Sequence, residues 1–87
     1  MNEKIDWFAN YTDDPSSGRT HSVRRFDRLR DARRFAQGRS GYIVRLSDGG
    51  ARTGTGLAYA RLAEYFGGFE PSAQEGARIR AIEGVDA

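Results

Sequence analysis

The chain contains no cysteine among its 87 residues. This excludes disulfide bonds, thiolate zinc sites and cysteine nucleophiles. Because small secreted domains commonly depend on disulfides, the absence favours a cytoplasmic protein. No apolar run approaches the roughly 20 residues of a membrane span, and the first residues, MNEKIDW, lack the basic start and apolar stretch of a signal peptide. We therefore expect cytoplasmic localisation and no membrane partner.

Side chains that commonly perform catalysis are also scarce. The one histidine, His21, is followed by Ser22, but neighbouring residues of a strand point to opposite faces and cannot form a catalytic pair. With one histidine and no cysteine, a transition-metal site is not expected. A chain this short has one modest core, which leaves little room for a buried cofactor. We predict a single domain spanning 1–87, without cofactor or metal, that is not an enzyme.

Positive charge is abundant, and it is concentrated in the middle of the chain. The formal net charge is only +2. Between Arg19 and Arg61, however, eleven arginines face three acids, a balance of +8, whereas the rest of the chain has three cations and nine acids, a balance of −6. Arginine outnumbers lysine thirteen to one, a ratio that a GC-rich genome also explains. The clustering has no such explanation, and it predicts an anionic partner.

The first third of the chain predicts an antiparallel hairpin. Apolar residues alternate along 4–11, as in a half-buried strand. Residues 12–18, TDDPSSG, are rich in turn formers, and 19–26 has the pattern of a second strand. If the N-terminal strand lies at the edge of the sheet, it can pair with a second copy of the chain as a homodimer.

A helix is predicted over 28–37. Asp27 is a suitable N-cap residue, and Gly38 can adopt the left-handed conformation that ends a helix. At 100° per residue the apolar stripe consists of Leu29, Ala32, Phe35 and Ala36, and the opposite face of Arg30, Arg33, Arg34 and Gln37.

The second half begins with the strongest predicted strand, 42–47. The turn DGG follows, with a short returning strand over 51–55 and a second helix over 57–66 that ends at Gly67 and Gly68. In the tail, Ser72 and Glu75 match a capping box, which predicts a helix start. Gly76 and the alternation after it favour a short turn and a last strand instead, with a helix as the alternative.

These elements follow the order β-β-α-β-β-α-β. The order predicts an α+β fold, with a small, mainly antiparallel sheet and two helices packed on one face.

The glycine-rich stretch 48–56, DGGARTGTG, lies between a predicted strand and a predicted helix. It lacks the lysine of a phosphate-binding P-loop and the third glycine of a dinucleotide fold. Arg52 and the free N–H groups of the following helix could still hold an anion. A tight turn before a capped helix is the alternative.

The strongest candidate site is a run of arginines from the second strand into the first helix. Repulsion among these charges costs stability, whereas phosphates would attract them. The partner-binding residues predicted are Arg24, Arg25, Arg28, Arg30, Arg33, Arg34, Arg39 and Arg52. A solvated surface, neutralised in part by the acidic ends of the chain, is the alternative. Base-stacking aromatics would be Trp7, Tyr11, Tyr42 and Tyr59, unless they belong to the core.

These features favour a non-enzymatic protein that binds nucleic acid or a nucleoprotein complex. A protein-binding inhibitor or adaptor, with its arginines on an acidic protein surface, is the other hypothesis.

In size and layout the chain resembles small accessory proteins of phages and plasmids, among which anti-CRISPR proteins are a diverse group. The resemblance lies in the short cysteine-free chain, the strong local charge and the strand–helix–strand unit from FDRL (26–29) to GYIV (41–44). It implies a stoichiometric inhibitor docked on a nucleoprotein machine at its nucleic-acid channel. No site residue carries over from it.

Overall fold

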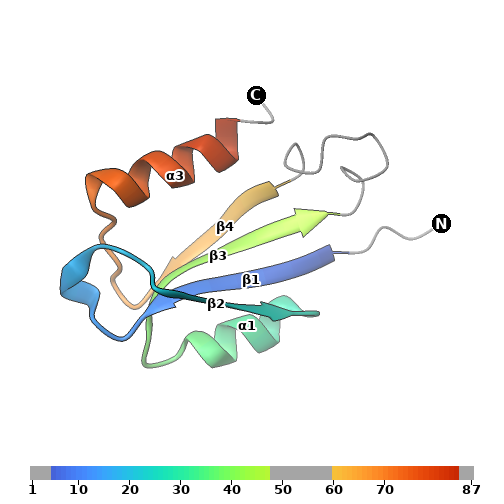
Figure 1. Ribbon diagram of the computed structural model, residues 1–87. Coiled ribbons are helices and arrows are strands. Elements are labelled where there is room, and N and C mark those ends of the chain that lie inside the picture. The colour runs from blue at the N-terminus through green and yellow to red at the C-terminus, as the bar shows by residue number, and fades with distance from the viewer. Residues whose placement is uncertain (1–4, 48–59, 85–87) are drawn as a thin grey trace.

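The computed structural model describes residues 5–47 and 60–84 (Figure 1). Two helices and four strands make up these ranges, together with one short 3-10 turn. In chain order they are β1 (Ile5–Thr12), η1 (Pro15–Ser17), β2 (Ser22–Phe26), α1 (Leu29–Ala36), β3 (Ser40–Ser47), β4 (Ala60–Phe66) and α3 (Ala73–Gly84). The predicted α+β class, with an antiparallel sheet and two helices, is confirmed.

The strands form one antiparallel sheet in the order β2-β1-β3-β4. The central pair, β1 and β3, is aligned from Ile5 opposite Ser47 to Thr12 opposite Ser40. The N-terminal strand therefore lies inside the sheet, and the edges of the described sheet are β2 and β4. A homodimer through β1, as suggested by the sequence, has no free strand edge to use.

The two helices pack on opposite faces of this sheet, not on one face as predicted (Figure 1). Phe35 of α1 contacts Tyr11 of β1, ring to ring at 4.9 Å. Ile79 of α3 packs instead with Tyr42 and Val44 of β3. The reason lies in β3, where consecutive apolar residues are buried, so both faces of the strand need a cover. We call these faces the α1 face and the α3 face.

The helix predicted over 57–66 is wrong where the structure describes it, because Ala60–Phe66 is strand β4. A β-bulge explains the error. Val44 pairs with Leu62 and Ile43 with Glu64, so the ladder contains one extra residue. Leu62 and Tyr65, three positions apart, consequently lie on the same face of the sheet, as they would on a helix.

The preference for a strand in the tail is also wrong, because Ala73–Gly84 forms the helix α3. The Ser72 side-chain oxygen accepts a hydrogen bond from the Glu75 N–H at 3.3 Å, which is the first half of a capping box. Ile79 is buried and Ile82 packs beside the same cluster. Ile79 and Ile82 are three residues apart, which places them on the same face of a helix. Their packing decides the structure of the tail, although the residues before them alternate between polar and apolar as in a strand.

Helix α1 agrees with its prediction to within one residue at each end, and its predicted stripe faces the sheet. The predicted N-cap is wrong. Arg28 occupies that position without a side-chain cap, and the Asp27 carboxylate instead accepts a 2.6 Å hydrogen bond from Arg25. Gly38 has a φ of +79°, as its helix-ending role requires.

Three predicted features lie outside the described residues: the strand over 51–55, the glycine-rich stretch and Arg52. Within the described ranges, neither helix has the length and apolar character needed to cross a membrane.

Candidate functional site

Helix α1 and its flanks bring six of the predicted arginines to one side of the molecule. Strand alternation places Arg24 on the α1 face, since it pairs with Ala9. Arg30, Arg33 and Arg34 are exposed on the helix itself. We call this set the arginine surface, and it consists of Arg24, Arg28, Arg30, Arg33, Arg34 and Arg39.

Arg25 does not belong to the arginine surface. It follows Arg24 in strand β2 and points to the α3 face, where it pairs with Asp6 at 2.8 Å and with Asp27 at 2.6 Å. The hydrogen bond to Asp6, followed by attraction to Asp27, raises the pKa of the Arg25 guanidinium. Arg25 thus has the carboxylate partners that a purely structural role predicts.

Three members of the arginine surface are held by neighbours. Arg33 donates two hydrogen bonds to the Glu64 carboxylate, at 3.0 and 2.7 Å. Arg24 and Arg39 both lie against the Phe35 ring, with guanidinium carbons 5.1 and 4.1 Å from the ring centre. Arg39 also donates to the Phe35 carbonyl at 2.8 Å. These contacts orient the three guanidinium groups without neutralising Arg24 or Arg39.

The other three members have no such contact. The side chains of Arg28, Arg30 and Arg34 are exposed and make no ion pair, hydrogen bond or ring contact within the described part of the chain. Arg30 and Arg34 are four residues apart on one helix, an arrangement in which like charges repel. The acids of the flanking segments therefore neutralise only part of the predicted basic cluster.

A groove of about 340 Å³ adjoins the C-terminal end of α1, where the helix faces strand β4. Its apolar lining includes Ala36 and Phe66, while the Arg33–Glu64 pair and Arg39 supply charged groups. We call it the α1–β4 groove. It combines apolar surface with two cations that already belong to the arginine surface.

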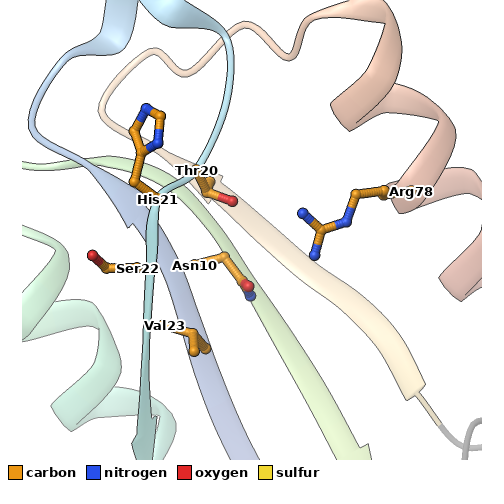
Figure 2. A pocket seen from close by; sticks show the side chains of 6 residues that line it. All are labelled: Asn10, Thr20, His21, Ser22, Val23 and Arg78. Atoms are coloured by element: carbon orange, nitrogen blue, oxygen red, sulfur yellow. The ribbon is translucent and has the colours of Figure 1, made fainter.

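A second pocket, of about 190 Å³, lies on the α3 face (Figure 2). Arg78 reaches from α3 toward Asn10, with Thr20 and Val23 beside them. This volume is below the roughly 300 Å³ at which small-molecule sites begin. His21 and Ser22 also line the pocket, and no carboxylate is among its described lining residues.

Next to this pocket, Glu75 is a buried carboxylate that the sequence did not single out as a site residue. One oxygen accepts hydrogen bonds from the Thr20 N–H and hydroxyl at 2.7 and 2.9 Å, and the other accepts one from the Tyr42 hydroxyl at 2.9 Å. Burial pushes the Glu75 pKa upward, but these bonds and nearby Arg78 outweigh it and lower the pKa. Glu75 therefore connects helix α3 both to Thr20, in the loop before β2, and to Tyr42 of strand β3.

The predicted stacking aromatics have other roles where they are described. Tyr42 belongs to the core, and Tyr11 is covered by Phe35 and Arg39. Trp7 is half-buried on the α1 face, while Tyr59 lies outside the described residues. Phe66 of the groove was not among the predicted site residues, because it was assigned to the end of a helix over 57–66 and not to a strand of the sheet.

Comparisons with protein-family models, with curated proteins and with solved structures find no match for this chain. Within 5–47 and 60–84, no three acidic or histidine side chains gather in a way that could hold a metal ion.

Proposed function

We propose that this chain is a non-enzymatic binding protein whose arginine surface engages nucleic acid, alone or within a nucleoprotein complex. One observation carries the proposal: Arg28, Arg30 and Arg34 are exposed together around α1 and lack a carboxylate partner within the described ranges. Phosphate oxygens would supply the missing partners through charge-assisted contacts.

The surroundings of these three arginines support the same proposal. From Arg24 to Arg39 the sequence has seven arginines and two acids, a balance of +5. Asp27 is engaged by Arg25, which lies on the other face. Arg24 and Arg39 are oriented by Phe35 and form no ion pair with a carboxylate of the described residues. A polyanion approaching α1 therefore meets several cations, of which two are already ordered.

Replacing Arg30 and Arg34 together with glutamine tests the proposal. Glutamine keeps the helix propensity and removes two charges that repel each other, so the free energy of unfolding is expected to hold or rise slightly. Affinity for a DNA or RNA oligomer is expected to fall roughly tenfold or more. The log–log dependence of the binding constant on salt is expected to flatten by about 0.7–0.9 for each phosphate that the variant no longer neutralises.

The matched control is Arg19 and Arg80 replaced with glutamine. Both are exposed and lie outside the arginine surface, and the change in net charge is the same. If both double variants lose equal affinity, binding depends on total charge and the arginine surface is not the site. If neither the parent nor the variants bind nucleic acid, and the arginine variant alone loses a protein partner, the inhibitor or adaptor hypothesis replaces this one.

A further inference from the structure

We infer that the α1–β4 groove accepts one unpaired base of a single-stranded nucleic acid, so that the protein prefers single strands to duplexes. This inference rests on the proposed function and adds a choice of strand type to it. Phosphate contacts alone would not distinguish bases or strand types.

The size and lining of the groove fit a base. Its volume of about 340 Å³ is at the lower end of the roughly 300–1,000 Å³ of ligand sites, enough for one ring system and its sugar. Phe66 offers an aromatic ring, and Ala36 extends the apolar surface. Sequence-tolerant binding of single strands typically combines such a stacking ring with cations along the backbone path.

The walls of the groove are held in place before any ligand arrives. The Ser40 hydroxyl donates to the Gly67 carbonyl at 2.8 Å. Gly67 lies so close to the main chain of Arg39 that an added Cβ would come within 1.9 Å of the Arg39 carbonyl oxygen. The Arg39 side chain is in turn fixed on Phe35. Such preorganisation reduces the entropy cost of binding.

The charges next to the groove favour a nucleotide over an uncharged aromatic group. Arg39 lines the groove beside the Arg33–Glu64 pair, and the helix carries the exposed Arg30 and Arg34 on its outer side. A strand whose phosphates follow these arginines brings a base to the end of α1. Only a base that is free of its complement can turn into the groove, which is the physical origin of the expected strand preference.

The test compares three oligomers with equal numbers of phosphates: a single-stranded DNA, the same chain built of abasic sugar–phosphate units, and a duplex. Binding of the full 87-residue chain is measured by fluorescence anisotropy at several salt concentrations. Base stacking contributes about fivefold to 150-fold in affinity per base. The single strand with bases is therefore expected to bind the parent at least about fivefold more tightly than the abasic chain.

Phe66→Leu is the diagnostic variant, because leucine keeps an apolar side chain and removes the aromatic face. It is expected to bind the base-bearing strand about as weakly as the abasic one, with an unchanged salt dependence. Tyr65→Leu is the matched control, since Tyr65 is the neighbouring residue of β4, is 45% exposed and faces the other side of the sheet. It is expected to behave as the parent.

The outcomes separate the two proposals. Equal binding of base-bearing, abasic and duplex oligomers by the parent would overturn the groove inference and leave the arginine surface in place. The same holds if a folded Phe66→Leu variant keeps its preference for bases. No binding to any oligomer would overturn both proposals. A 2-aminopurine base that is quenched by the parent, but not by Phe66→Leu, would support the inference directly.

Discussion

Replacing Tyr42 with phenylalanine removes a single oxygen atom from the interior of the protein. That hydroxyl is 2.9 Å from the Glu75 carboxylate, and the two residues are 1% and 2% exposed. A hydrogen bond to a charged group is worth about 1.5–3 kcal/mol, and a buried carboxylate that loses a donor gains little from solvent. We expect the free energy of unfolding to fall by about 2 kcal/mol, and the melting temperature of this small domain to fall by roughly 8–16 °C.

Thermal and urea unfolding at pH 7 measure this loss. Tyr65→Phe is the matched control, because it removes the same atom from a residue that is 45% exposed. A surface change of this kind is expected to stay within about 0.5 kcal/mol of the parent. Identical melting of parent and Tyr42→Phe would contradict the role assigned to Glu75.

The dependence on pH supplies a second check. Because the folded-state pKa of Glu75 is lowered from 4.5, this carboxylate stabilises the fold above pH 4.5 and its contribution is lost as the pH falls below that value. Without the Tyr42 donor the pKa is lowered less. The difference in the free energy of unfolding between the parent and Tyr42→Phe is thus expected to become smaller as the pH drops below 4.5. A gap that stays constant from neutral pH into the acid range would refute the charge-assisted bond.

Three further predictions concern stability. Burial and the bond to Glu75 raise the pKa of Tyr42 from 10.0 to about 12. The protonated hydroxyl therefore stabilises the fold below pH 10, and this contribution is lost as the pH rises toward 12. The free energy of unfolding of Tyr42→Phe, measured over the same alkaline range, is expected to lack this pH-dependent loss. Gly76→Ala is expected to stabilise the protein by about 0.5–1 kcal/mol in urea unfolding, since the added methyl group meets only the flexible end of Arg80 at 3.4 Å. Gly41→Ala is expected to lower the free energy of unfolding by about 3 kcal/mol or more, because its Cβ would lie 1.9 Å from the Asn10 carbonyl oxygen; a thermal melt equal to that of the parent would contradict this close approach.

Local patterns in the sequence predicted much of the first half of the fold. The helical stripe around Phe35 and the glycine after it determine α1, and alternation determines β1. The tail was harder to predict, because Ile79 between two arginines fits a strand as well as a helix. Only its packing with Tyr42 and Val44, which lie far away in the chain, distinguishes the two.

The candidate site was predictable only as a cluster of charges. Consecutive arginines in β2 point to opposite faces, so Arg24 contributes to the arginine surface while Arg25 does not. Arg25 pairs with Asp6 and Arg33 with Glu64. The sequence could not predict these ion pairs, because the positions of the two acids follow from the order of the strands in the sheet. The groove depended on Phe66, and its location required the bulge in β4 to be known.

The interior position of β1 has a consequence for how the chain folds. Its partners in β3 are 28 to 42 residues away along the sequence, from the pair Thr12 and Ser40 to the pair Ile5 and Ser47. Closing loops of this length is slow, so pairing of β1 with β3 is a natural barrier in folding, whereas the β1–β2 hairpin closes quickly. Once formed, the central strands have neighbours on both sides, and their amides should exchange with solvent last. Hydrogen exchange is therefore expected to rank β1 and β3 above β2 and β4 in protection, and the same pair should limit the folding rate.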